Sequence, residues 1–285
     1  DLHPDTQPEQ VIERIQGAEV VITNKVKVTR EAMSDTPELK LICEAATGMN
    51  NVFLEAAEER GIQVKNVKGY STDSVAQQTF ALLLALLNAT AYYDDYVKTG
   101  QYSNERIFTH LGRPYWELSG KRFGFLGLGE IGRQVARSAL AFGAEVVYFS
   151  ASGQDYNVIY KRLELDEFLR TCDVISIHAP LSTDSENLLN YARIAQMKPT
   201  ALLLNTSRGG IVNEADLAKA LDDELIAGAA IDVFTQEPIP PSHPYMQLQK
   251  KDKLLLAPHI AWSSIEARTR LMDKVADNIR GYLAG

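Results

Sequence analysis

The 285-residue sequence contains only two cysteines and five histidines, and it has no excess of positive charge. Cys43 and Cys172 lie far apart, each beside an apolar run, so we expect buried free thiols of a reducing cytoplasm rather than a disulfide. Neither residue type occurs at metal-ligand spacing, and we predict no metal site. The net charge of −8 argues against the broad basic face that nucleic acids and anionic membranes require.

Long hydrophobic runs, repeats and a leader segment are also missing. The most apolar stretch, residues 80–87, is far too short to span a bilayer. We find no signal peptide, internal repeat or low-complexity segment. Hydrophobic residues make up 45% of the chain and charged residues 23%, as in globular proteins, and the length suffices for two domains. We therefore predict a two-domain cytoplasmic protein without a membrane partner.

The first segment of the chain alternates between short apolar runs and amphipathic stretches. This alternation is typical of a small parallel α/β domain. The segment opens on a helix and Asp1 is not a start methionine, so we expect a truncated chain whose natural first strand lies upstream. The expected helices span residues 6–17, 29–34 and 51–60, and the expected strands span residues 18–23, 39–45 and 62–67.

A long apolar helix is expected next, from a capping box at Ser74 and Gln77 to about residues 99–100. The apolar face of residues 75–87 is wider than one small domain needs. The helix is therefore either a buried core helix or a hinge or subunit interface, and we predict a two-fold homodimer with this helix at its interface. The irregular, aromatic residues 101–117 are predicted to form a connection packed on a surface.

The rest of the chain is organised around a glycine-rich turn. The apolar run 123–126 predicts a buried strand, which is followed by G-x-G-x-x-G at Gly127, Gly129 and Gly132 and then by an amphipathic pattern. The first glycine allows the tight turn, the second lets a pyrophosphate approach the backbone, and the third lets the new helix pack on the strand. Free N–H groups at the start of that helix would bind the phosphates. The sequence thus predicts a dinucleotide site.

Five further strands are expected after this turn, with helices between them. Six strands alternating with helices indicate a doubly wound Rossmann domain. The additional strands are expected at residues 145–149, 174–177, 201–204, 227–231 and 254–256, the intervening helices near residues 165–170, 191–197 and 214–221, and a last helix at residues 264–283.

Three polar side chains follow strands in the second half of the chain. Arg208, Glu237 and His259 each come after an expected strand, and ligands of open parallel sheets bind beyond the carboxyl ends of the strands. Arg208 can polarise a carbonyl and hold a carboxylate bidentately. His259 can pass a proton to an alkoxide, with the Glu237 carboxylate orienting the imidazole. Together the three groups suit reversible reduction of a carbonyl.

At these residues the chain resembles the D-isomer-specific 2-hydroxyacid dehydrogenase family, and the resemblance covers nearly all of it. The matching signatures are the glycine turn, the segments around Arg208, Glu237 and His259, and two short runs, His178-Ala179-Pro180-Leu181 and Met197-Lys198-Pro199. The resemblance implies that Arg208, Glu237 and His259 are catalytic and that His178 has a structural role beside the cofactor. It also implies that Arg208, His259 and the backbone N–H groups of Thr47 and Gly48 bind the substrate. The implied cofactor-binding residues are Gly127, Gly129, Glu130, Ile131, Gly132, Ser150, Ala179, Pro180, Thr206, Ser207, Asp232, His259 and Ala261, with the Asp232 carboxylate on the nicotinamide carboxamide.

The family resemblance also implies a domain plan. A smaller flavodoxin-like substrate domain would comprise residues 1–98, completed by residues 265–285. The Rossmann dinucleotide-binding domain would comprise residues 99–264.

The residue that selects the cofactor departs from the expected pattern. An acid normally follows the second strand of the dinucleotide domain, where it binds the ribose hydroxyls and repels a 2′-phosphate. Ser150 stands in that place, and no arginine stands beside it; whether Lys161 or Arg162 folds back is left open. We therefore expect NAD with incomplete discrimination against NADP.

The resulting hypothesis is an NAD(P)-dependent D-2-hydroxyacid dehydrogenase. The residues after His259, Trp262-Ser263-Ser264 and Glu266-Ala267-Arg268, are most similar to the glycerate dehydrogenase (hydroxypyruvate reductase) branch, so hydroxypyruvate and D-glycerate are the expected substrates. D-lactate and phosphoglycerate dehydrogenases are the enzymatic alternatives. An NAD(H)-sensing corepressor that binds protein partners is the alternative from another class.

Overall fold

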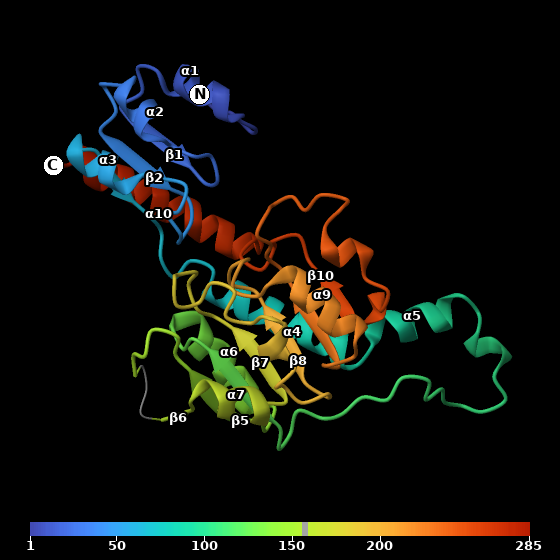
Figure 1. Cartoon of the computed structure of the whole chain (residues 1–285). Coiled ribbons are helices and arrows are strands. Elements are labelled where there is room, and N and C mark those ends of the chain that lie inside the picture. The colour runs from blue at the N-terminus through green and yellow to red at the C-terminus, as the bar shows by residue number, and fades with distance from the viewer. Residues whose placement is uncertain (156–158) are drawn as a thin grey trace. The chain divides into compact units, whose positions relative to one another are not determined.

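The computed structural model of the chain describes residues 1–155 and 159–285 (Figure 1). The chain divides into two compact units, Asp1–Ser71 with Ser263–Gly285 and Thr72–Trp262. Both are built from parallel strands flanked by helices, which confirms the predicted α/β class. Residues 72–98, which we expected in the smaller domain, belong to the second unit because their first helix packs on that unit's sheet.

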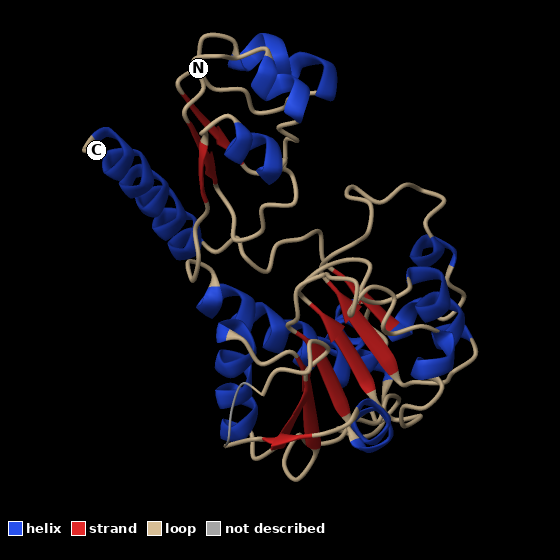
Figure 2. Ribbon diagram, turned by 60° about the vertical axis from the view of Figure 1, so that its left-hand side comes forward, coloured by secondary structure: helices blue, strands red, loops and turns tan. Residues whose placement is uncertain are grey.

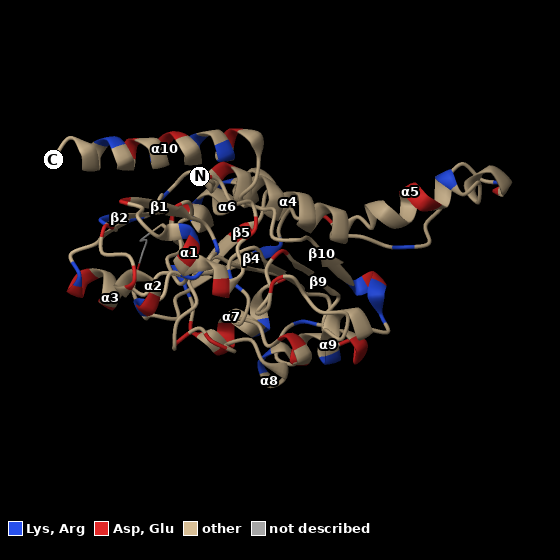
Figure 3. Cartoon of the chain, turned by 90° about the horizontal axis from the view of Figure 1, so that it is seen from above, with Lys and Arg blue, Asp and Glu red and all other residues tan. Residues whose placement is uncertain are grey.

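The first unit is a small three-stranded parallel sheet in the order β1-β2-β3. The last helix, α10, packs on the central strand β2 and buries Ala267, Leu271 and Val275. It begins at a serine cap, since the Ser264 hydroxyl accepts the N–H of Ala267 at 3.1 Å, and both signs of charge lie along it (Figure 3). The elements are η1 (Pro8–Gln10), α1 (Val11–Ile15), β1 (Val20–Thr23), α2 (Arg30–Ser34), β2 (Leu41–Glu44), α3 (Leu54–Glu59), β3 (Gln63–Lys65) and α10 (Ile265–Leu283).

The second unit is a seven-stranded parallel sheet in the order β10-β9-β8-β7-β4-β5-β6, with helices on both faces (Figure 2). The six predicted strands are present, which confirms the doubly wound architecture. The seventh strand, β6, was not predicted. The strands are β4 (Arg122–Leu126), β5 (Glu145–Phe149), β6 (Lys161–Arg162), β7 (Val174–Ile177), β8 (Leu202–Asn205), β9 (Gly228–Ile231) and β10 (Leu254–Leu256).

Two apolar cores cover the two faces of this sheet. One joins α4 and α6 to the sheet, and the other joins α7, α8 and α9 to it. Strands β7, β8 and β9 are buried throughout, which explains their continuous apolar runs. The remaining elements are α4 (Thr72–Leu87), α5 (Thr90–Lys98), η2 (Tyr102–Asn104), α6 (Glu130–Ala141), α7 (Leu165–Thr171), α8 (Tyr191–Ile194), α9 (Glu214–Asp222), η3 (Pro244–Gln247) and η4 (Lys251–Lys253).

The long helix predicted after Ser74 is in fact two helices. α4 begins at Thr72, so Ser74 is not its cap, and the Ser74 hydroxyl donates to the carbonyl of Ala261 at 2.6 Å. Ala89 adopts a left-handed conformation with φ 50°, and α5 leaves at 59° to α4. Within the described residues no single helix is long and apolar enough to cross a membrane. The bent pair α4 and α5, taken together, has the length and the apolar composition of a membrane span. α4 is a core helix, with Phe80 and Leu83 buried in its own unit.

Residues 90–117, here called the arm, extend away from the sheet of the second unit (Figure 1). Residues 101–117 were predicted to pack on a surface, and only the end of this segment does so: Arg113 pairs with Asp252 at 2.5 Å, and Trp116 packs against the core of the larger sheet. The preceding part of the arm folds on itself, with the ring of Tyr96 stacked on His110 at 3.8 Å. Its outward side chains are apolar and exposed: Ile107 (64%), Phe108 (90%), Leu111 (81%) and Tyr115 (61%).

A carboxylate is buried at the end of β2 in the first unit. Glu44 is fully buried; its Oε2 accepts the amide of Asn51 at 2.8 Å, and its Oε1 has no hydrogen-bond partner among the described residues. Burial raises the pKa of Glu44 from 4.5 to about 7, against the smaller opposing effects of the Asn51 amide and of Lys25. The fold therefore favours the neutral acid.

This carboxyl should make stability depend on pH. Below about pH 4.5 both the folded and unfolded chains hold the proton, whereas between 4.5 and about 7 only the folded chain does, so its contribution to stability falls as pH rises through that window. Glu44→Gln should match the native chain near pH 4.5 and exceed it above pH 7, by up to about 3 kcal/mol. Urea unfolding at both pH values measures the difference, with the exposed Glu58→Gln as control. An equal difference at both pH values would contradict this prediction.

Candidate active site

The predicted catalytic residues come together at one edge of the larger sheet. Arg208 follows β8, Glu237 follows β9 and His259 follows β10, and these three strands are neighbours. All strands of the sheet are parallel, so their carboxyl ends share this edge (Figure 2). Topology thus places a cation, a carboxylate and an imidazole on the same rim.

His259 and Glu237 form a direct pair. The His259 Nδ1 atom lies 2.8 and 2.7 Å from the two carboxylate oxygens of Glu237. Since a carboxylate can only accept, Nδ1 carries the hydrogen. The Glu237 Oε1 atom also accepts the backbone N–H of Phe234 at 3.0 Å. No hydrogen bond to the other ring nitrogen, Nε2, is found among the described residues, so this atom can exchange a proton with a substrate.

Asp232 fixes the segment that carries His259. This residue is fully buried, and its two carboxylate oxygens accept the N–H groups of Ile260 and Ala261, each at 2.9 Å. Burial raises the pKa of Asp232, and the two backbone hydrogen bonds oppose this shift. His259 itself has φ 54°, an uncommon conformation for a residue with a side chain. The two N–H contacts of Asp232 hold the chain in that conformation.

The loop after β8 presents Arg208. The Asn205 amide donates to the carbonyl of Arg208 at 2.8 Å, and the Asn205 Oδ1 atom accepts the N–H of Ser207 at 3.1 Å. Arg208 is half-buried; its Nη1 atom donates to the carbonyl of Ser207 at 2.8 Å, and no carboxylate of the described residues pairs with it. The next residue, Gly209, is pressed against Phe234, because a Cβ here would lie 2.0 Å from the Phe234 carbonyl carbon. The loops of Arg208 and Glu237 therefore support each other.

The glycine turn has the geometry that a dinucleotide requires. Gly127 has φ 88°, and a Cβ on it would lie 2.8 Å from the backbone nitrogen of Ala179. A Cβ on Gly132 would lie 2.7 Å from the carbonyl oxygen of Gly127. Gly129, by contrast, faces open space, and no side chain caps the start of α6. The turn thus leaves room and free N–H groups for a pyrophosphate, and the residues fit the cofactor.

His178 packs beneath this turn. Its Nε2 atom lies 2.8 Å from the Ser176 hydroxyl, and its ring stacks on Phe125. Burial lowers the pKa of His178 to about 3, so the ring is neutral and cannot serve as a proton donor near neutral pH. Its position agrees with the structural role expected for it.

The other predicted cofactor residues lie at the same edge of the sheet. Ser150 is buried at the end of β5, Ala179 and Pro180 follow β7, and Glu130 and Ile131 begin α6. The Ser207 hydroxyl donates to the Ala179 carbonyl at 2.5 Å. Their contacts with a dinucleotide stay predictions.

Thr206 is held by a residue that the sequence analysis missed. Its hydroxyl lies 3.0 Å from that of Thr79 on α4, and Thr79 itself donates to the carbonyl of Val75. Thr206 is thus the donor of the pair, which leaves its oxygen free to accept. The sequence signal for this contact was a threonine on the buried side of an otherwise apolar helix.

Thr47 and Gly48 follow β2 in the first unit. The Thr47 hydroxyl donates to the carbonyl of Val67 at 3.0 Å, and the Asn66 amide donates to the carbonyl of Thr47 at 2.6 Å. The N–H groups of Thr47 and Gly48 donate to no group in the described part of the chain. Their binding of a substrate carboxylate stays a prediction.

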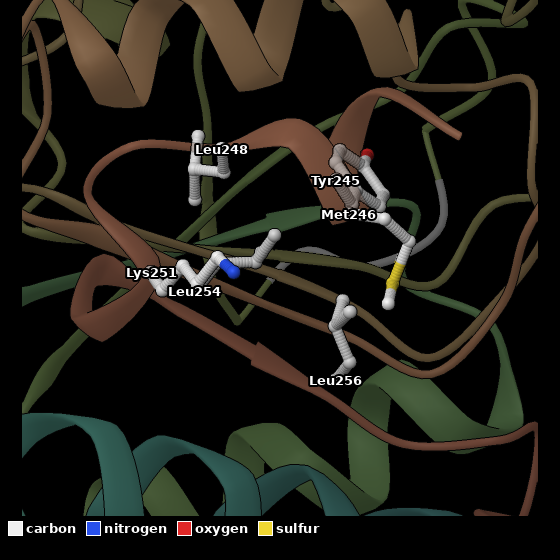
Figure 4. A pocket seen from close by; sticks show the side chains of 6 residues that line it. All are labelled: Tyr245, Met246, Leu248, Lys251, Leu254 and Leu256. Atoms are coloured by element: carbon white, nitrogen blue, oxygen red, sulfur yellow. The ribbon is translucent and has the colours of Figure 1, made fainter. Parts of the chain in front are cut away.

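Neither the pocket beside β10 nor any cluster of metal-ligating side chains in the described residues adds a candidate site. A pocket beside β10 is lined by Tyr245, Met246, Leu248, Lys251, Leu254 and Leu256, none of them a predicted site residue (Figure 4). Among residues 1–155 and 159–285 no group of three histidine, cysteine or acidic side chains could hold a metal ion.

Comparison with known proteins agrees with this geometry. Residues 80–261 match the family described as D-isomer specific 2-hydroxyacid dehydrogenase, NAD binding domain. The chain is 36% identical to a glycerate dehydrogenase of Methylorubrum extorquens over 98% of this chain and 87% of the relative. It is also 36% identical to a hydroxypyruvate reductase of Blautia hydrogenotrophica, with the same coverage of 98% and 87%.

Two similar solved structures contain a cofactor. A D-lactate dehydrogenase from Aquifex aeolicus, complexed with NAD and lactic acid, has a TM-score of 0.84 at 28% identity and covers 96% of this chain and 85% of its own. An NADPH-dependent glyoxylate/hydroxypyruvate reductase from Sinorhizobium meliloti, in complex with NADP and malonate, has a TM-score of 0.85 at 26% identity. It covers 97% of this chain and 84% of its own.

Proposed function

Because the chain belongs to the D-isomer-specific 2-hydroxyacid dehydrogenase family, a family of oxidoreductases, we propose that it interconverts hydroxypyruvate and D-glycerate with NAD(H) or NADP(H). Relatives named glycerate dehydrogenase and hydroxypyruvate reductase, at 36% identity over almost the whole chain, support this substrate pair. We further propose that the second unit binds the dinucleotide and the first unit is the substrate domain. The glycine turn supports the first of these roles.

The pairing of His259 with Glu237 is the observation that carries the proposed chemistry. The nicotinamide, when bound, supplies the hydride to the keto carbon. His259 donates a proton from Nε2 to the keto oxygen, while Glu237 holds Nδ1 and balances the imidazolium charge. Arg208, with no carboxylate partner among the described residues, polarises the carbonyl and binds the neighbouring carboxylate. In the oxidation of the hydroxy acid the same imidazole accepts the proton.

A panel of 2-keto acids tests this proposal. Purified enzyme would be assayed by loss of reduced-nicotinamide absorbance with hydroxypyruvate, glyoxylate, pyruvate and phosphohydroxypyruvate. We expect the highest kcat/KM for hydroxypyruvate. Higher values for pyruvate or phosphohydroxypyruvate would instead indicate a D-lactate or phosphoglycerate dehydrogenase. Dinucleotide binding without turnover of any acid would favour the NAD(H)-sensing corepressor.

A cytoplasmic location is proposed from the two thiols. Cys43 and Cys172 are both free and buried. Burial raises the pKa of each, that of Cys172 to about 12, so both stay protonated and unreactive. Two cysteines that form no disulfide suit a reducing compartment.

We propose a homodimer whose interface is the arm rather than α4. α4 is a core helix, so the excess apolar surface that we assigned to it is used within its own unit. Exposed apolar side chains gather on the arm instead, and such clusters mark interaction sites. Two copies of this chain related by a two-fold axis would cover them.

Light scattering coupled to size exclusion tests the dimer. We expect twice the mass of one chain for the native protein and a single-chain mass after Phe108→Lys and Leu111→Lys together, because burying two ammonium groups opposes association. Leu140→Lys, an exposed apolar residue on α6 outside the arm, is the control and should stay dimeric. A native protein that elutes as a single chain at micromolar concentration would remove the proposal.

A further inference from the structure

Strand β6 brings a cation to the end of β5. It pairs in parallel with β5, with Val147 opposite Lys161 and Tyr148 opposite Arg162. Arg162 therefore lies beside the carboxyl end of β5, which Ser150 follows directly. In the sequence this arginine stands twelve positions after Ser150, and the strand pairing brings them together.

The guanidinium of Arg162 is held against the turn after β5 and keeps unused donors. Its Nη1 atom donates to the carbonyl of Gly153 at 2.7 Å, and its Nη2 atom lies 4.0 Å from the position of a Cβ on Gly153. Its Nε atom is buried and has no hydrogen-bond partner within residues 1–155 and 159–285. Arg162 forms no ion pair with an acid of the described residues, whereas its neighbour Lys161 pairs with Glu167 at 3.3 Å. A full positive charge thus stands at this turn without a counter-ion in the described part of the chain.

The turn itself supplies hydroxyls and lacks an acid at the selecting position. Only 3% of the surface of Ser150 is exposed, and its Oγ atom lies 3.3 Å from the Oγ atom of Ser152. The one acid of residues 150–155, Asp155, accepts a hydrogen bond from the Tyr148 hydroxyl. Position 150 itself thus carries a hydroxyl and not the acid that would repel a phosphate.

From this arrangement we infer that Arg162, Ser150 and Ser152 form a binding site for the 2′-phosphate of NADPH. The inference rests on the proposed dinucleotide role of the second unit. A guanidinium with free donors binds a phosphate through charge-assisted hydrogen bonds, and serine hydroxyls add neutral ones. The enzyme accordingly uses NADPH at least as well as NADH. This revises the expectation of an NADH preference, which rested on the absence of any arginine next to Ser150 in the sequence.

Dinucleotide affinity tests the site independently of catalysis. The Kd values of NADPH and NADH would be measured by fluorescence titration of the full chain, and their ratio compared between variants. Arg162→Ala should raise the ratio of the NADPH Kd to the NADH Kd about 10- to 100-fold, as the loss of charged hydrogen bonds implies. Arg162→Lys should recover part of it, and Ser150→Asp should raise the ratio as strongly by repelling the phosphate. Lys161→Ala removes an adjacent cation that is already paired, and should leave the ratio unchanged.

The results separate this inference from the proposed function. A ratio that stays constant in Arg162→Ala and in Ser150→Asp would overturn the 2′-phosphate site, even if hydroxypyruvate is reduced well. A ratio that Lys161→Ala raises as much as Arg162→Ala would also overturn it, because the effect would then be general charge rather than this site. If no keto acid is reduced but the ratio depends on Arg162, the site stands and the proposed reaction fails.

Discussion

Replacing His259 by alanine should lower kcat for keto-acid reduction by about two to four orders of magnitude, the usual contribution of a general acid. His259 is bound to Glu237 through Nδ1, which leaves Nε2 as the atom that can donate a proton. Without the imidazole, the oxygen of the reduced carbonyl must take its proton from water. Steady-state kinetics with saturating hydroxypyruvate and reduced dinucleotide measure the loss.

Because His259 is in a left-handed conformation, a second variant is needed that keeps this conformation while it removes the imidazole. Alanine at φ 54° costs backbone energy that has nothing to do with proton transfer, whereas asparagine tolerates this conformation. His259→Asn should therefore lose as much kcat as His259→Ala. Glu237→Gln should lose less, because the imidazole keeps a hydrogen-bond partner but not a counter-charge. A His259→Asn enzyme with near-native kcat would remove His259 as the proton donor.

Adding one methyl group at Gly209 should disrupt the two loops that carry the candidate catalytic residues Arg208 and Glu237. A Cβ at this position would lie 2.0 Å from the carbonyl carbon and 2.2 Å from the carbonyl oxygen of Phe234, distances that only backbone movement can relieve. Gly209→Ala should cost about 3 kcal/mol or more in the free energy of unfolding, as overpacking against a rigid neighbour does. It should also lower kcat/KM at least about tenfold, because Arg208 and Glu237 move with these loops.

The adjacent glycine offers the control for that substitution. Gly210 has φ 80°, but a Cβ on it would meet side-chain atoms at ordinary contact distances, those of Leu181 at 3.6 Å and of Thr235 at 4.0 Å. Gly210→Ala should therefore cost only the strain of a left-handed alanine, about 1 to 2 kcal/mol. Thermal unfolding and hydroxypyruvate kinetics of the two variants give the comparison. Equal losses in both would mean that the contact with Phe234 is not the cause.

The parts of this protein that could be predicted are those with a local signal. The run from Phe123 to Gly132 contains its own strand, turn and helix start, so its position depended on no distant residue. Arg208 and His259 could be assigned because each directly follows an apolar strand of a parallel sheet. Glu237 could be placed at this edge by the same argument, and the family resemblance implied the catalytic role of all three residues. The roles of Thr47 and Gly48 came only from it, and they remain predicted.

Other features depended on tertiary contacts or on segments too short to show a pattern. Strand β6 contains two residues, too few for any periodicity, so the return of Arg162 to Ser150 could not be seen. The break between α4 and α5 falls at Asn88 and Ala89, with neither glycine nor proline to mark it. Thr72 begins α4 two residues before the capping pattern at Ser74, whose hydroxyl instead bonds a carbonyl distant in sequence.

The discontinuous first unit has a consequence for synthesis of the chain on the ribosome. All residues of the second unit, Thr72–Trp262, are consecutive, so its sheet can close once that stretch has emerged. Strand β2, by contrast, lacks the helix that packs on it until Ile265–Leu283 has been made. The strands of the first unit therefore keep apolar surface exposed while Thr72–Trp262 is synthesised. Of the two units, the first is therefore the one whose nascent strands need chaperone protection longest.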